Sequence, residues 1–61
     1  MNKSILGAER WRSVSPSRGG SYISTASFAA ADGGPDIFIR VREATERAAR
    51  DALETRIAQY L

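Results

Sequence analysis

The side chains that most often carry enzyme chemistry are scarce in this sequence. It contains no Cys and no His, so a nucleophilic Ser would lack its usual imidazole base and a zinc ion its usual ligands. Asp32 and Asp36 flank a turn and come nearest to a calcium pattern, but the EF-hand spacing is absent around them. The other carboxylates mostly lie close to Arg and would have to do acid-base work alone. We predict a protein that is not an enzyme and that needs no metal or cofactor.

Aromatic and arginine side chains are the more informative set, because these residue types dominate the binding energy of interfaces. Phe38, Arg40 and Arg42 alternate along the chain with three apolar residues: Ile37, Ile39 and Val41. That period of two places the aromatic ring and both cations on one face of a predicted strand. As a functional site they would form a small hot spot. The alternative is an ordinary solvated sheet face with one exposed aromatic residue, which needs no special explanation.

Trp11 stands between Arg10 and Arg12 and also has two interpretations. We expect it in the core, because it is the largest apolar side chain available to a thin domain. The alternative is a surface contact point that combines an aromatic ring with cations. Tyr60, near the chain end, could face a second subunit. The candidate partner-binding residues are therefore Trp11, Arg12, Phe38, Arg40, Arg42 and Tyr60.

Three extended segments are predicted to hold these side chains. Residues 11–14 contain an aromatic and a β-branched residue, and turn-forming Pro and Gly follow at 15–20. Residues 22–30 and 36–42 form the other two segments, separated by Asp-Gly-Gly-Pro, the strongest turn signal in the chain. An even-numbered loop there would place the even-numbered residues of 22–30 on the same face as the apolar residues of 36–42. The first set is Tyr22, Ser24, Ala26 and Phe28, and the second is Ile37, Ile39 and Val41. An odd-numbered loop would exchange the two faces of residues 22–30.

The apolar period becomes helical after Glu43, which predicts an amphipathic helix over about residues 43–60. Thr45 could cap the helix one turn later. Pairs of Glu and Arg at i,i+4 support its solvent face, namely Glu43 with Arg47 and Glu46 with Arg50. The predicted fold is therefore α+β, a small antiparallel sheet of two or three strands packed on one C-terminal helix. Residues 1–9 are expected to be a flexible arm and residues 10–61 a single domain.

The length of 61 residues leaves a thin core, and disulfide and zinc supports are excluded by composition, so a homo-oligomer or a larger partner is expected to add stability. No stretch has the ~20 apolar residues that a membrane-spanning helix requires. The absence of Cys fits a reducing compartment, and we expect a cytoplasmic protein. From these features we predict a protein-binding regulator or inhibitor of a larger complex, of the kind found among small phage and mobile-element proteins.

DNA is the alternative partner. The predicted order of three strands and a helix is similar to the three-stranded-sheet DNA-binding domains of the integrase arm-binding and AP2 type, in which the sheet enters the major groove. The residues that carry this resemblance are Trp11-Arg12, Arg40, Arg42 and the start of the helix at 45–53. It implies that Arg12, Arg40 and Arg42 contact bases or phosphates. A net charge of only +2 is small for a domain that binds DNA through its phosphates.

Overall fold

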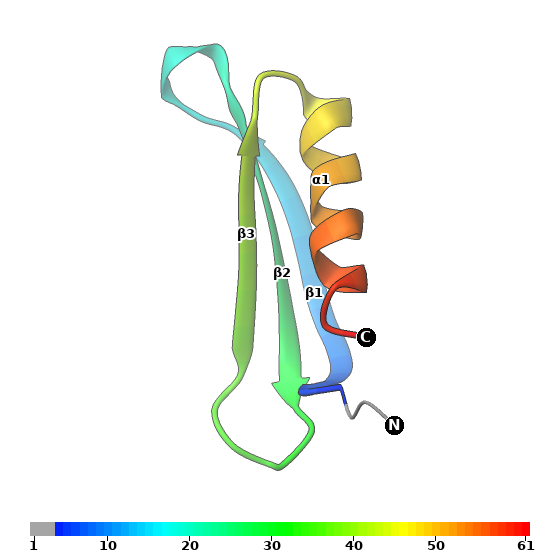
Figure 1. The fold of residues 1–61 in the computed structure, drawn as a ribbon. Helices are drawn as coiled ribbons and strands as arrows, with labels where there is room; N and C mark the ends of the chain where they lie inside the picture. The colour runs from blue at the N-terminus through cyan, green and yellow to red at the C-terminus, as the bar shows by residue number, and fades with distance from the viewer. Residues whose placement is uncertain (1–3) are drawn as a thin grey trace.

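Three antiparallel strands and one helix make up the chain in a computed structural model that describes residues 4–61. The central strand is β2 (Tyr22–Ala30), with β1 (Leu6–Pro16) and β3 (Ile37–Glu43) on its two sides. A short 3-10 turn, η1 (Arg18–Gly20), joins β1 to β2, and α1 (Glu46–Ala58) follows β3 and packs against one face of the sheet (Figure 1). The predicted α+β class with a C-terminal helix is confirmed. Residues 1–3 of the predicted arm lie outside the described residues.

β1 is longer than predicted and includes part of the segment assigned to the arm. It begins at Leu6 and ends at Pro16, whereas the sequence indicated a strand only over 11–14. Gly7, Ala8 and Glu9 have low strand propensity, so this stretch is extended because it pairs with β2, where Leu6 lies opposite Ala30. Burial of Leu6, which is 7% exposed, ties the start of the strand to the core.

The β2–β3 hairpin has the register expected for an even-numbered loop. Ser24 lies opposite Val41 and Ala26 opposite Ile39, which selects the even-numbered loop of the two alternatives that the sequence left open. The loop itself spans residues 31–36, so the Asp-Gly step sits inside a longer connection than a two-residue turn. Its shape is fixed by the Asp32 Oδ1 atom, which accepts a 2.9 Å hydrogen bond from the Gly34 N–H.

The helix begins later and ends earlier than predicted. Glu43 is the last residue of β3, and the Thr45 Oγ1 atom accepts a 3.1 Å hydrogen bond from the Ala48 N–H, which makes Thr45 the N-cap. The expected pair of Glu46 and Arg50 is present, with 2.7 Å between carboxylate and guanidinium. Glu43 precedes the helix, so it forms no helical i,i+4 pair with Arg47.

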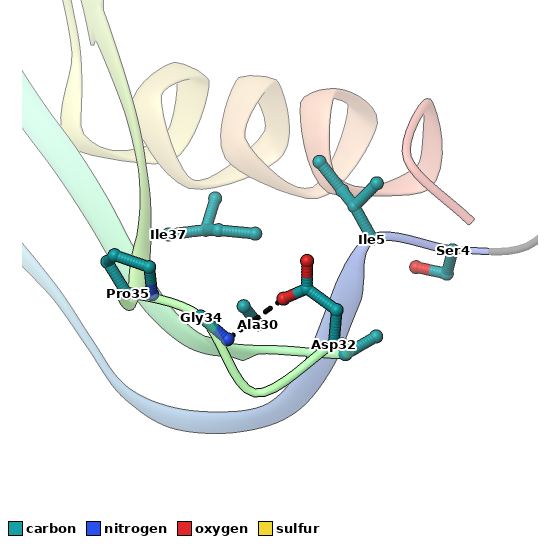
Figure 2. A pocket seen from close by; sticks show the side chains of 8 residues that line it. Ser4, Ile5, Ala30, Asp32, Gly34, Pro35 and Ile37 are labelled. Atoms are coloured by element: carbon teal, nitrogen blue, oxygen red, sulfur yellow. Dashed lines mark hydrogen bonds between the residues drawn. The ribbon is translucent and has the colours of Figure 1, made fainter.

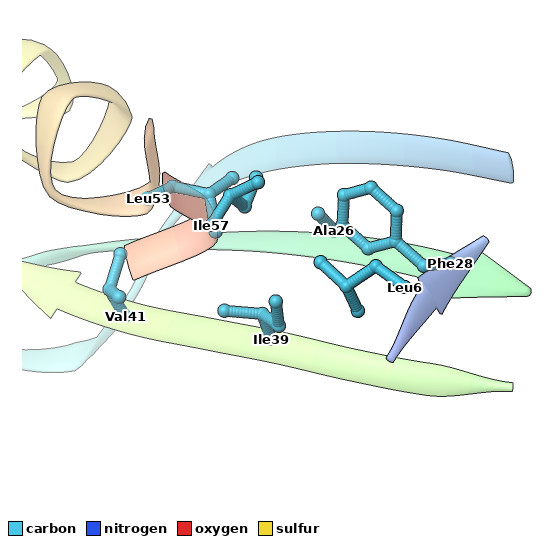
Figure 3. Close-up of a cluster of buried hydrophobic side chains, with 7 residues drawn as sticks. All are labelled: Leu6, Ala26, Phe28, Ile39, Val41, Leu53 and Ile57. Carbon is cyan, nitrogen blue, oxygen red and sulfur yellow. The ribbon is translucent and has the colours of Figure 1, made fainter. Parts of the chain in front are cut away.

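The core lies between α1 and one face of the sheet (Figure 3). Every strand and the helix contribute apolar side chains to it: Leu6, Ala26, Phe28, Ile39, Val41, Leu53 and Ile57. Ala49 of α1 is fully buried, so the helix packs closely on the sheet at this position. Within residues 4–61, no helix has the length and apolar character needed to cross a membrane.

Candidate functional site: the open face of the sheet

The face of the sheet that points away from α1 is here called the open face. Residues opposite one another on neighbouring antiparallel strands project to the same side, so the strand register defines this surface as three rows. The rows, each read from β1 across β2 to β3, are Trp11, Ser27 and Phe38, then Ser13, Thr25 and Arg40, then Ser15, Ile23 and Arg42. The structure therefore brings four of the six predicted site residues together: Trp11, Phe38, Arg40 and Arg42.

Trp11 belongs to this face, and the expectation that it fills the core is wrong. Its ring stands edge-on to Phe38, with 6.0 Å between ring centroids and an interplanar angle of 62°. Trp11 is 47% exposed and Phe38 is 62% exposed. The cause is a register shift between Glu9 and Trp11. If the pairing of Glu9 with Phe28 continued without it, Trp11 would lie opposite Ala26 and face the core. One extra residue in β1 moves the ring to the other face.

Ser27 lies beneath the two rings. Its neighbours on either side are Trp11 and Phe38, whose strands are separated by two strand spacings of about 4.8 Å each. Because the ring centroids are only 6.0 Å apart, the rings lean toward each other over β2, and Ser27 is 1% exposed. The Ser27 Oγ atom has no hydrogen-bond partner among residues 4–61. A buried hydroxyl of this kind destabilises the fold.

Arg40 and Arg42 extend the face toward the η1 end of the sheet. Both side chains are exposed, and in the part of the chain that the structure describes neither forms an ion pair. At the opposite end, the Arg10 Nε atom lies 2.9 Å from the Asp36 Oδ2 atom, which links β1 to the residue before β3. The open face thus combines an aromatic pair with two cations that are available to a partner.

Arg12 is not part of the open face. It lies opposite Ala26, in a row that faces α1, and its guanidinium contacts the carboxylates of Glu9 and Glu54. Hydrogen bonds from Arg12 lower the pKa of Glu9, and hydrogen bonds to Glu9 and Glu54 raise the pKa of Arg12. The expected grouping of Arg12 with Arg40 and Arg42 is therefore wrong, because alternation along β1 directs Arg12 toward the helix.

Tyr60 is also separate from the open face. It follows the end of α1, where its backbone N–H donates a 2.9 Å hydrogen bond to the Ile57 carbonyl oxygen. The side chain is 37% exposed on the helix side of the molecule. The structure does not bring Tyr60 together with the aromatic pair.

A pocket of about 550 Å³ lies where the start of the chain meets the β2–β3 loop (Figure 2). It is lined mainly by apolar side chains and backbone of Ile5, Ala30, Pro35 and Ile37. Asp32, its one carboxylate, is engaged by the Gly34 N–H. Asp32 and Asp36 are thus held by separate contacts, and residues 4–61 contain no group of three or more potential metal-binding side chains.

Sequence reasoning did not identify Ser27 as part of the site, because the face of residues 22–30 depended on the loop and nothing local showed that Trp11 closes over this serine. It also missed the contacts of Arg10 with Asp36 and of Arg12 with Glu54, since they join residues far apart in the chain. Comparison of the chain with protein-family models, curated protein sequences and solved structures gave no match.

Proposed function

We propose that this chain is a non-enzymatic, cytoplasmic protein-binding module that regulates or inhibits a larger complex through its open face. The observation that carries the proposal is the Trp11–Phe38 pair, two large rings that stand about half exposed and in contact with each other. Aromatic side chains with few rotatable bonds lose little entropy on binding, and they supply most of the energy at many interfaces. The contact between the rings further restricts them before a partner arrives.

Arg40 and Arg42 suggest the chemistry of the partner surface. A guanidinium with no carboxylate in contact can donate two parallel hydrogen bonds to a carboxylate. On the same face, Arg40 lies in the row next to the aromatic pair and Arg42 one row further along β3. The partner that fits this arrangement has an apolar depression for the rings and acidic side chains at its border.

The test compares two truncations of exposed apolar side chains. Tagged wild-type chain is used to isolate a partner from host extract, and the purified partner is then titrated with each variant. Phe38→Ala is expected to raise the dissociation constant by at least ~30-fold, the effect of a hot-spot residue. Leu61→Ala, at a residue that is 70% exposed and lies beyond α1, is the matched control and should change it less than about twofold. Equal binding by wild type and Phe38→Ala, with unchanged circular dichroism, would exclude the open face.

Duplex DNA is the second candidate ligand, favoured by the unpaired state of Arg40 and Arg42 within the described residues. Affinity for DNA should fall steeply between low and moderate salt. The double variant Arg40→Ala/Arg42→Ala should reduce the slope of log affinity against log salt concentration by about two, one for each lost phosphate contact. Arg12 no longer belongs to this hypothesis, because Glu9 and Glu54 occupy its guanidinium. The absence of any duplex binding at low salt would rule it out.

A further inference from the structure

The outer edge of β3 lacks the bulges and prolines that often prevent an edge strand from pairing, although the strand carries the charged residues Arg40, Arg42 and Glu43. Residues 37–43 follow β2 without a register shift and contain no Pro, Gly or Lys. Among residues 4–61, no element lies beside this edge (Figure 1). β1 is different, because its pairing with β2 has two register shifts and the strand ends in Pro16.

The side chains along this edge are complementary to themselves. When residues 36–42 are placed antiparallel to a second copy with Ile39 opposite Ile39, Asp36 falls opposite Arg42 and Phe38 opposite Arg40. Each of those two combinations then occurs twice. Opposite charges in a cross-strand pair, and a guanidinium beside an aromatic ring, both stabilise strand pairing. On the helix side, Ile37 falls opposite Val41, so apolar residues also meet.

Other registers lose this complementarity. Centring the pairing on Arg40 would place two guanidinium groups directly opposite each other, which destabilises a sheet. Centring it on Phe38 would leave Arg42 opposite Gly34 in the loop. A shift by one residue would place Ile39 opposite Arg40 and turn the two helices to opposite faces of the sheet.

We propose that two copies of this chain pair through β3, in the register centred on Ile39, to form a dimer with a continuous six-stranded sheet. Asp36 is suited to its role because its contact with Arg10 uses Oδ2, which leaves Oδ1 for Arg42 of the second copy. A carboxylate can accept hydrogen bonds at both oxygens. Pairing also satisfies the outward backbone groups of β3 and extends the thin core of a short chain.

Glu54 contacts Arg12, so the Glu54 side of α1 faces β1. Ala48, Ala52 and Arg56 follow one another at i,i+4 spacing on the opposite side of the helix, and Ala52 is partly buried against the core. In the proposed dimer this side of α1 would approach the second copy.

The dimer leaves the Trp11 rings accessible, but it places Phe38 opposite Arg40 and Asp36 opposite Arg42 of the second copy, so it shares these side chains with the proposed function. Sedimentation of the isolated chain needs no partner, so it tests the dimer separately from the proposed function.

The experiment uses two charge reversals and their mixture. Sedimentation equilibrium should show that Asp36→Lys and Arg42→Glu each raise the dimer dissociation constant about 10- to 100-fold, since both symmetric contacts become repulsive. An equimolar mixture should recover near wild-type association as a heterodimer. In that heterodimer the new lysine faces the new glutamate, and the remaining Asp36 faces the remaining Arg42. Arg42 forms no ion pair within residues 4–61, so Arg42→Glu should leave circular dichroism unchanged. Asp36→Lys also removes the contact with Arg10, so recovery of association in the mixture is the result that separates loss of the dimer contact from a change within the chain.

Two results would overturn the proposal: a monomeric wild type at the highest concentration reached, or a mixture that associates no better than the separate variants. A second measurement needs no substitution. Amide hydrogen exchange within β3 should slow as the wild-type concentration rises, while exchange along the outer edge of β1 stays constant. Exchange in β3 that does not depend on concentration would equally contradict pairing through this edge.

Discussion

Leu53 and Leu61 allow the same substitution to be compared in the core and on the surface. Leu53 is 1% exposed and belongs to the core cluster between α1 and the sheet, together with Ile39, Val41 and Ile57 (Figure 3). Leu61 is 70% exposed at the end of the chain. Leu53→Ala should therefore remove a buried side chain and leave a cavity, whereas Leu61→Ala should remove mainly solvated surface.

The expected loss for Leu53→Ala is about 2–5 kcal/mol, the range found for buried leucines. A single core in a chain of this length rarely supplies more than about 3–5 kcal/mol, so the variant should be largely unfolded or close to it at 25 °C. The free energy of unfolding is measured by urea titration followed by circular dichroism at 222 nm, at one fixed protein concentration. Leu61→Ala should stay within about 0.5 kcal/mol of wild type.

A Leu53→Ala variant within 1 kcal/mol of wild type would refute the assignment of Leu53 to the core. Equal destabilisation by both variants would refute it as well, because the two sites differ in burial. Either result would mean that α1 does not cover the sheet as described.

Three further predictions concern single contacts. Ser27→Ala should raise the free energy of unfolding by about 1 kcal/mol, because it removes a buried hydroxyl that lacks a partner among residues 4–61; a decrease in the urea midpoint would contradict this. Gly7→Ala should lower it by about 1–3 kcal/mol, since the added Cβ would lie 2.9 Å from the Ala29 carbonyl oxygen; urea titration measures this too. Arg12 lowers the pKa of Glu9 in the folded chain. The contact between Glu9 and Arg12 therefore stabilises the fold at pH values above the ordinary pKa of a glutamate. This stabilisation is lost as the pH falls from there through the lowered pKa of the folded chain. The free energy of unfolding, measured at pH 6 and at pH 3, should decrease less for Arg12→Gln than for wild type.

The faces of β3 were predictable because Ile37, Ile39 and Val41 alternate cleanly, a signal that is local in sequence. The buried face of β2 was not, since it depends on whether the loop is even or odd, and the structure has the even-numbered alternative. The helix was predictable from its local apolar period, although Thr45 rather than Glu43 marks its beginning.

β1 was less predictable because its conformation depends on a strand that follows it in sequence. Gly7 and Ala8 carry no strand signal, and only pairing with β2 makes this stretch extended. The face occupied by Trp11 depends on a register shift, and a shift of one residue leaves no mark in the hydrophobic pattern. Arg12 was assigned to the wrong surface for a related reason, since its partner Glu54 lies on the helix.

The difference between the two edges of the sheet limits how far association can proceed. If both outer strands were flat and unprotected, each copy could recruit another on either side, and the sheet would grow into a fibre. The register shifts and Pro16 give β1 an outer edge that pairs poorly. If the copies pair through β3 as proposed, a two-fold axis uses the free edge of both copies, so assembly would close at two chains. The irregular β1 would then limit further association and aggregation.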